Sequence, residues 1–304
     1  MRFRAGIESV DTFYKIIQAV EKLQKRCVIK FTETDLHIIC ANDVNEGGIQ
    51  VWSQIKIPSL FNDLRIQSNA NNQISMLLSP EALLSALRSA ANPSTASTSN
   101  AVLHQVEAVM RLAKKNDQAV LSFEINGLSR NAGRYVRVNH DVRIEIMKPQ
   151  DVQRLSEPMC PEPDVHVLLP QLTKLRAVVE RLRSLSDTVA IRANRSGRLE
   201  FSVRTDSVST DVAWTGLSNP TMAKEGGSQE PSQISQPHDP EEMFGVLISV
   251  KSFLQFLNSH VVSTTTIACI CQNHCMILYV YIGEVADAGG VLTYYIPAMV
   301  DDTS

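Results

Sequence analysis

Two segments that lie far apart in the chain carry the same pattern, and any fold must accommodate both. Residues 11–26 and residues 172–185 each place apolar side chains on one face at helical spacing. One basic helix face alone is typical of an ordinary solvated surface. Two such faces, in a chain of formal net charge -3, instead indicate cations set apart for a polyanion. The basic residues are Lys15, Lys22, Lys25 and Arg26 in the first segment and Lys174, Arg176, Arg181 and Arg183 in the second.

The elements around these helices also recur in the same order. In each half, short β-branched or aromatic runs predict a strand before the basic helix and a group of strands after it. A second helix follows, at residues 81–91 with Arg88 as its only basic residue, and at residues 249–259 with Lys251 on its polar side. Further strands complete each half. This repeated order predicts a duplicated α+β chain whose two similar domains each place two helices on antiparallel sheets.

A proline-rich segment separates the two halves. Residues 148–164 contain four prolines, which favour an extended linker over a helix or strand. We therefore expect a first domain at residues 1–147 and a second at residues 165–304. Two polar stretches depart from the repeat, and we expect a mobile insertion at about residues 91–105 and a disordered loop at about residues 224–240.

The composition is that of a globular protein. The chain has 304 residues, of which 44% are hydrophobic and 20% charged, enough to bury a sizeable core. No run approaches the roughly 20 apolar residues that span a bilayer, and the N-terminus lacks the apolar core of a signal peptide. We therefore expect no membrane association and a location inside the cell. Six cysteines, mostly within apolar runs, then suit free buried thiols better than disulfides.

The sequence offers little for catalysis. It contains no Gly-x-x-x-x-Gly-Lys-Ser/Thr loop, no His-Glu-x-x-His and no Gly-x-Ser-x-Gly elbow. One cluster has metal-binding residue types, and an enzyme built on it is an alternative that would require bound metal. Cys269 and Cys271 alternate along an expected strand, however, and His274 falls at an expected hairpin turn before Cys275. Buried thiols are therefore favoured over zinc, and we predict no enzymatic activity, no cofactor and no metal.

Short motifs that extend from the first residue to nearly the last together resemble one protein family. They are Met1-Arg2-Phe3-Arg4-Ala5, Gly47-Gly48 before Trp52, Glu157-Pro158 leading through Pro161 and Pro163 to Asp164-Val165, Leu169-Pro170, Leu217-Ser218-Asn219-Pro220, Phe253-Leu254-Gln255-Phe256-Leu257 and Tyr294-Tyr295-Ile296-Pro297-Ala298. Each is unspecific by itself. In order and spacing they resemble the Hus-one family, subunits of the DNA-damage checkpoint clamp and relatives of the replication clamp proliferating cell nuclear antigen. The two polar stretches depart from that pattern.

The resemblance implies a sliding-clamp fold, in which helices line the inner wall of a ring and sheets form its outside. It implies a non-catalytic subunit of a heterotrimeric ring that encircles DNA at damage sites in the nucleus and acts as a platform for checkpoint signalling and repair proteins. The implied partners are two related subunits of the Rad-nine and Rad-one types, double-stranded DNA bound without sequence preference, and an ATP-driven clamp loader. The alternative is a homotrimeric replication clamp, which would share the fold.

The basic helix faces are then the candidate DNA surface. A helix of about 16 residues is roughly 24 Å long, enough to approach phosphates on both sides of a groove. Lysine and arginine contacts to the backbone carry no sequence information, which suits a ring that slides. The residues assigned to this surface are Lys15, Lys22, Lys25, Arg26, Arg88, Lys174, Arg176, Arg181, Arg183 and Lys251.

Two further surfaces are expected to serve assembly and partner binding. Edge strands at residues 135–146 and 208–214 are candidates for pairing with neighbouring chains, and a proline at Val138 or Val212 should prevent assembly. The edge residues are Val136, Val138, Val142, Ile144, Val208, Val212 and Trp214. By the resemblance, a groove for partner peptides is bordered by Pro161, Pro163, Tyr295, Ile296 and Pro297; these residues could equally only pack the domains together.

Overall fold

The structure, a computed structural model, describes residues 1–41, 48–91, 103–129, 134–220, 239–263, 265–284 and 288–299. Its first half alternates strands with three helices. The elements are β1 (Arg2–Ile7), α1 (Val10–Val20), β2 (Cys27–Phe31), β3 (Asp35–Cys40), β4 (Gln50–Lys56), α2 (Ile57–Leu60), β5 (Phe61–Gln67), β6 (Ile74–Leu78), α3 (Pro80–Arg88), β7 (Leu103–Lys115), β8 (Gln118–Ser129) and β9 (Tyr135–Ile146).

The second half follows the same order after a short linker helix, α4 (Pro149–Gln153). Its elements are β10 (Val165–Leu168), α5 (Leu172–Leu182), β11 (Thr188–Ala193), β12 (Leu199–Arg204), β13 (Ser209–Trp214), β14 (Phe244–Ser249), α6 (Val250–Phe256), η2 (Leu257–Val261), β15 (Thr266–Cys271), β16 (Cys275–Ile282) and β17 (Gly290–Pro297). Between β13 and β14 the described residues contain no counterpart of β5.

The strand pairing repeats as closely as the element order. In the first half β2 pairs with β3 and β6, β3 with β4, and β7 with β1 and β8. In the second half β11 pairs with β12 and β14, β12 with β13, and β15 with β10 and β16. By this correspondence β4 matches β13 and β9 matches β17. The two halves therefore share this pairing scheme, as the repeated sequence pattern predicted, although the β6–β9 and β1–β5 ladders of the first half have no counterpart among the described strands of the second.

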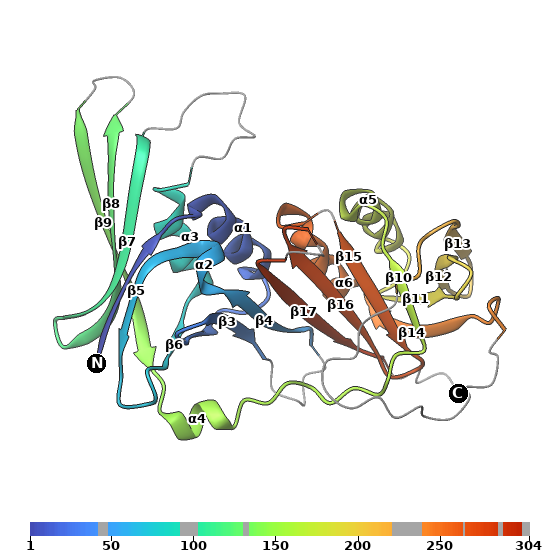
Figure 1. Ribbon diagram of the computed structural model, residues 1–304. Coiled ribbons are helices and arrows are strands. Elements are labelled where there is room, and N and C mark those ends of the chain that lie inside the picture. Colours follow the sequence, from blue (N-terminus) through green and yellow to red (C-terminus); the bar gives the residue numbers. More distant parts are fainter. Residues whose placement is uncertain are drawn as a thin grey trace.

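One strand pair connects the halves. β17 pairs with β4 from Gly290 opposite Ile55 to Tyr295 opposite Gln50. This ladder merges most strands into a 13-stranded sheet, with a separate four-stranded sheet of order β13-β12-β11-β14 at the end of the second half. The chain is consequently one elongated body (Figure 1).

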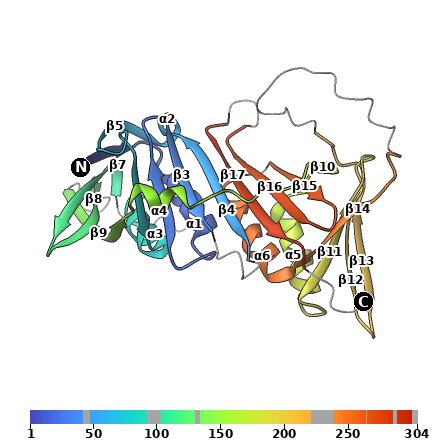
Figure 2. The ribbon, with the colours of Figure 1, turned by 90° about the horizontal axis from the view of Figure 1, so that it is seen from below.

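The helices and the linker lie on opposite sides of this sheet. In Figure 1, α3, α1, α6 and α5 form a row, in that order, along one side, while α4 and the rest of the linker run along the other. Figure 2, viewed from below, shows the linker crossing the strands of both halves. The helices pack through their apolar stripes: Phe13, Ile16 and Ile17 of α1 and Leu175 and Val179 of α5 are all buried at 1% exposure or less. Their polar faces are left on the outside of the row.

Several predicted boundaries are wrong. The first basic helix ends at Val20 rather than at residue 26, because only Leu23 is apolar before β2 and the chain needs the intervening residues to turn into that strand. At 11 residues, α1 is about 16 Å long, two thirds of the expected length. The second basic helix ends at Leu182. β5, β6 and β14 were not predicted, and the linker is not wholly extended, since Pro149 begins α4 at a position that tolerates proline.

The expected insertion at residues 91–105 and loop at residues 224–240 lie mostly outside the described residues. The described part of the insertion already includes the start of β7 at Leu103, so that boundary was placed too late.

The start of α3 provides a test of the local signals. The side-chain oxygen of Ser79 accepts a hydrogen bond from the Ala82 N–H at 3.3 Å, and Pro80 occupies the first turn. We expect Ser79→Ala to lower the free energy of unfolding by about 1 kcal/mol, since it leaves an N–H of the first turn without its partner. Urea denaturation measures this. Ser85→Ala, at an exposed position of the same helix, is the control and should lose no stability; equal losses would contradict the cap.

Candidate nucleic-acid interface and open sheet edges

Most of the predicted cations lie on the row of helices with exposed side chains. Lys15 is on α1, Arg88 ends α3, and Lys251 is on α6. The second basic helix exposes three of its cations, Lys174, Arg181 and Arg183, and Arg183 is the C-cap residue of that helix. Lys22 and Lys25 are exposed in the segment that follows α1. The row thus presents eight of the ten assigned cations to solvent, where the positive charge can meet phosphate oxygens.

The other two cations already have partners within the chain. The guanidinium of Arg26 forms an ion pair with Glu145 of β9. Arg176 is half-buried, and its guanidinium donates to Glu180 at 2.8 Å and to Asn258 of η2 at 2.7 Å. Arg176 therefore connects α5 to η2. Both residues are less available for DNA than the sequence pattern predicted.

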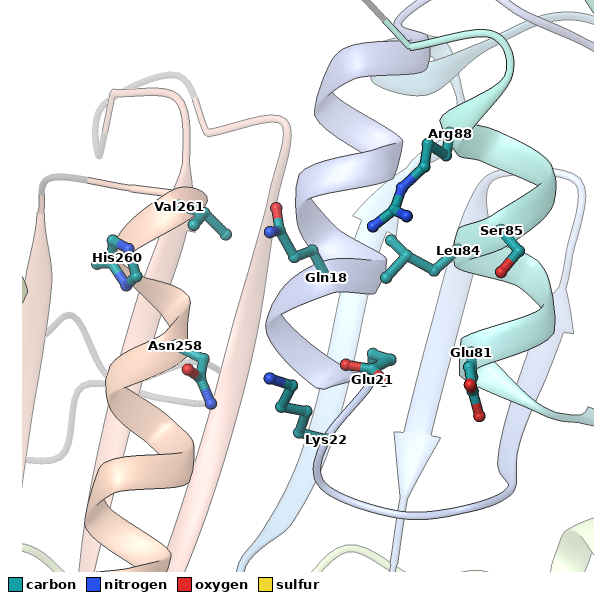
Figure 3. Close-up of a pocket in the computed structure, with 10 residues that line it drawn as sticks. All are labelled: Gln18, Glu21, Lys22, Glu81, Leu84, Ser85, Arg88, Asn258, His260 and Val261. Atoms are coloured by element: carbon teal, nitrogen blue, oxygen red, sulfur yellow. The ribbon is translucent and has the colours of Figure 1, made fainter. Parts of the chain in front are cut away.

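The junction of the two halves forms a hollow in the helix row. Its cavity measures about 340 Å³ and lies between α1, α3 and η2. Figure 3 shows Gln18 and Lys22 facing Asn258 and His260 across it, with Arg88 on the opposite wall. Gln255 of α6 donates to the Lys22 carbonyl at 3.2 Å. The hollow thus brings Arg88 of α3 and Lys22, from the segment that follows α1, to one site.

His260 is a candidate that the sequence pattern missed. Its ring Nδ1 lies 2.9 Å from the Leu257 carbonyl, which can only accept, so Nδ1 carries a proton and Nε2 is the free nitrogen. The exposed His260 borders the hollow on the side opposite Lys22. Its position depends on η2, a 3-10 turn at the end of α6, whereas the sequence predicted one continuous helix.

Carboxylates interrupt the basic surface. Glu21 and Glu81 border the same hollow as Lys22 and Arg88, and Glu180 is paired with Arg176. The surface therefore offers separated point charges rather than one uniform patch. Such an arrangement suits weak, salt-sensitive contacts to a regular phosphate backbone.

β13 is an edge strand of the four-stranded sheet. It pairs with β12 on one side, and no other described strand pairs with it. The predicted strand began at Val208, but Val208 instead closes the turn, where its N–H donates to the Thr205 hydroxyl and its carbonyl accepts from the Thr205 N–H. Trp214 turns its ring inward onto Phe201, at 5.0 Å between ring centroids. The open feature of this edge is thus the backbone from Ser209 onward.

β9 is an edge along only part of its length. Residues 135–143 pair with β8, whereas Ile144, Glu145 and Ile146 pair with β6 on the other side of β9. Ile144 is therefore inside the sheet, contrary to its assignment. Val142 is buried at 3% exposure and belongs to the core. The open backbone of this edge lies along residues 135–143.

The hydrogen-bond pattern determines which residues face outward at each edge. Antiparallel ladders alternate between bonded and non-bonded pairs. The Thr205 N–H bonds the Val208 carbonyl, so Val212 points its backbone groups toward β12, and Asp211 points them away. The Met147 N–H bonds the Ser75 carbonyl, so the odd-numbered residues of β9, including Asn139, face the open side. Prolines at Val138 and Val212 were thus the wrong test, since both would break the chain's own sheet.

The linker lies against the outer face of β15–β17. The Tyr295 hydroxyl donates to Glu157 at 2.5 Å, and the Gln272 N–H donates to the Asp164 carboxylate at 2.7 Å. Burial and that contact with the Glu157 carboxylate raise the pKa of Tyr295. Four of the five predicted groove residues lie on this face or beside it: Pro161, Pro163, Tyr295 and Pro297. Pro161 is exposed, and the other three are half-buried. Ile296 is fully buried on the helix side, because adjacent strand residues face opposite ways.

The cysteine cluster is buried. Cys269, Cys271 and Cys275 have 4% exposure or less, and His274 is exposed at the turn. In the described part of the chain no group of three or more histidine, cysteine or acidic side chains is arranged to hold a metal ion. No helix among the described residues is long and apolar enough to cross a membrane.

Comparison with known proteins identifies the family. Residues 1–300 match the family model described as Hus1-like protein. The chain belongs to the Hus1-like protein family. It is 34% identical to the checkpoint protein hus1 of Schizosaccharomyces pombe over 99% of this chain and all of that protein, and 27% identical to human checkpoint protein HUS1 over 98% of this chain and all of that protein.

A solved structure independently supports the fold. Proliferating cellular nuclear antigen from Entamoeba histolytica superposes with a TM-score of 0.68, covering 98% of this chain and 99% of that one. At 12% sequence identity this likeness concerns the fold alone. The chain therefore has the sliding-clamp fold, as the sequence resemblance implied.

The two sides of β13 can be distinguished by stability. Val212→Pro removes an N–H that bonds β12, whereas Asp211→Pro removes one that faces solvent in the isolated chain. We expect Val212→Pro to lower the free energy of unfolding by about 1–3 kcal/mol more than Asp211→Pro does. Urea denaturation of the isolated chain measures the difference. The reverse order would show that the assigned hydrogen-bond alternation is wrong.

Proposed function

We propose that this protein is a non-catalytic subunit of a heterotrimeric checkpoint clamp that encircles DNA at damage sites. The observation that carries the proposal is the pairing of β17 with β4 inside the chain. Its counterpart by the internal repeat is a pairing of β9 with β13. Within one chain, β9 and β13 belong to different sheets and lie at opposite ends of the elongated molecule. The same ladder can therefore form only between chains.

Such a contact is head-to-tail, because β9 of one chain meets β13 of the next. Contacts of this kind close into rings when the rotation between subunits permits it. Membership of a family whose curated members are checkpoint proteins supports two related but different partners of the Rad-nine and Rad-one types. The alternative, a homotrimeric replication clamp, would require β9 and β13 of this chain to be complementary to each other.

The helix row then faces the enclosed DNA. Its exposed lysines and arginines contact phosphates without reading bases, and the ring supplies the lasting hold. The chain brings no nucleotide-binding loop, so an ATP-driven loader opens the ring. The linker side, outside the ring, receives repair and checkpoint proteins near Pro161, Tyr295 and Pro297. The site of action is the nucleus, where the damaged DNA is.

The DNA-facing assignment predicts a change in salt dependence. In the assembled ring, Lys22→Ala with Arg181→Ala should weaken DNA association. The slope of log affinity against log salt should fall in magnitude by about 0.9 for each cation that contacts phosphate. Fluorescence anisotropy with a DNA duplex over a salt series measures both quantities.

A matched double variant provides the control. Lys148→Ala with Arg154→Ala removes the same charge from exposed positions at α4, on the other side of the sheet. We expect this variant to retain the original slope. If the two double variants changed the slope equally, only total charge would matter, and the inner-face assignment would be wrong.

The assembly itself is tested by native mass spectrometry of the complex recovered with this chain from its own cells. We expect one copy each of this chain and of two different clamp-like chains. Asn139→Pro and Asp211→Pro should each reduce that assembly, since each removes an outward N–H from an open edge. Asn139→Ala and Asp211→Asn keep the N–H and should assemble normally. A trimer of this chain alone would favour the replication clamp instead.

A further inference from the structure

Three thiols meet where the linker crosses the β15–β16 hairpin. Cys271 and Cys275 lie directly opposite each other in the antiparallel register. Cys160, from the linker, packs against the same apolar cluster on the outer face of the sheet. The Cys275 thiol is within hydrogen-bonding reach of both Cys160 and Cys271. All three are free thiols in this structure, and Cys275 is the central one.

The three differ in access and in chemistry. Cys160 is half-buried, between Met159 at 96% exposure and the exposed Pro161. The Cys275 S–H donates to it, which lowers the pKa of Cys160 and raises that of Cys275. The contact with Cys275 lowers the pKa of Cys271 as well. Cys271, however, is buried at 0% exposure, and its S–H donates to the Pro161 carbonyl at 3.4 Å, so access separates the two thiols. Since thiolate character and exposure determine reactivity, Cys160 is the first thiol that an oxidant reaches.

We propose that hydrogen peroxide oxidises Cys160 and that Cys275 then captures it in an intramolecular disulfide. The Cys160 thiolate attacks one peroxide oxygen, the O–O bond breaks, and hydroxide leaves, giving a sulfenic acid. The Cys275 thiol gives its proton to that hydroxide and attacks the Cys160 sulfur, and the sulfenic oxygen leaves as a second hydroxide, which takes up a proton. In sum, two thiols and one peroxide give one disulfide and two waters.

The disulfide would join the linker to the end of β16. Only hydrogen bonds and packing hold this part of the linker in the reduced chain, and Figure 2 shows the linker extending across the outer face of the sheet. The bond closes a loop on the order of 100 residues, a length at which disulfides constrain the unfolded chain strongly. The linker also borders the proposed partner-protein surface, and any effect there rests on the proposed function. The crosslink itself does not.

The test uses the full chain, without DNA or partner subunits. The chain is treated with hydrogen peroxide, remaining thiols are blocked with N-ethylmaleimide, and an unreduced digest is analysed by mass spectrometry. We expect a peptide pair linked through Cys160 and Cys275 within one chain, which dithiothreitol releases. The midpoint of thermal unfolding should rise by roughly 5 to 10 °C on oxidation and return on reduction.

Two single variants determine which thiols react. Cys160→Ser should lose both the linked peptides and the rise in the midpoint. Cys271→Ser should keep both, because the Cys271 thiol is not consumed; Cys271→Ala replaces it if the serine variant fails to fold. The proposal is overturned if Cys160 is oxidised without a crosslink, if the crosslink joins separate chains, or if Cys271 and Cys275 pair equally well in Cys160→Ser. Failure of the DNA or assembly experiments leaves these outcomes unchanged.

Discussion

The backbone ladder between β4 and β17 is the contact on which the rest of the architecture depends. It connects the two copies of the repeated scheme into one sheet, and so it places both pairs of helices on the same side. On the helix side, the packing of α1 against η2 and the hydrogen bond from Gln255 to the Lys22 carbonyl add to this connection. Main-chain groups make the β4–β17 contact, so the side chains of the two strands are constrained chiefly by burial. On β17, Tyr294 and Ile296 point into the core on the helix side, whereas Tyr295 points to the outer face.

The helix row resolves two opposing demands. Each helix must bury an apolar stripe. Each must also leave its cations in water, because burying an unpaired charge would be costly. Apolar residues that recur every three or four positions form one face of a helix and leave the opposite face to cations. On α1, for example, Ile16 is buried while the adjacent Lys15 is exposed. Two cations are paired instead: Arg26 with Glu145 of β9, and Arg176 with Glu180 of its own helix, while Arg176 also donates to Asn258 of η2. What remains exposed is a set of separated charges, suited to attraction without a fixed register.

Local sequence signals predicted what depends on local physics. The stripes of α1 and α5 and the duplicated order followed from spacing and residue type. β14 could also have been found, because Phe244–Ser249 is a short, mostly apolar run that contains the β-branched residues Val246 and Ile248. β5 is harder to find, because it carries polar residues and a positive φ of 45° at Asp63. Partners that are distant in sequence were not predictable. Arg26 and Glu145 are 119 residues apart, and Arg176 and Asn258 are 82 apart, so their pairing depends on the assembled fold.

The open edges explain why a chain of this design is suited to a closed assembly. An unpaired strand exposes N–H and C=O groups that can pair with any other strand, and proteins usually protect such edges with charges, bulges or covering segments. β5, the strand at one end of the large sheet, follows that rule: its pairing with β1 has a register irregularity between Arg4 and Gly6, and its Asp63 forms an ion pair with Arg4 at 2.7 Å. β9 leaves its outward backbone open along residues 135–143, next to Tyr135 at 85% exposure. A closed ring would pair that edge, since every β9 then meets a β13-type strand, which an open chain of subunits could not achieve at its two ends.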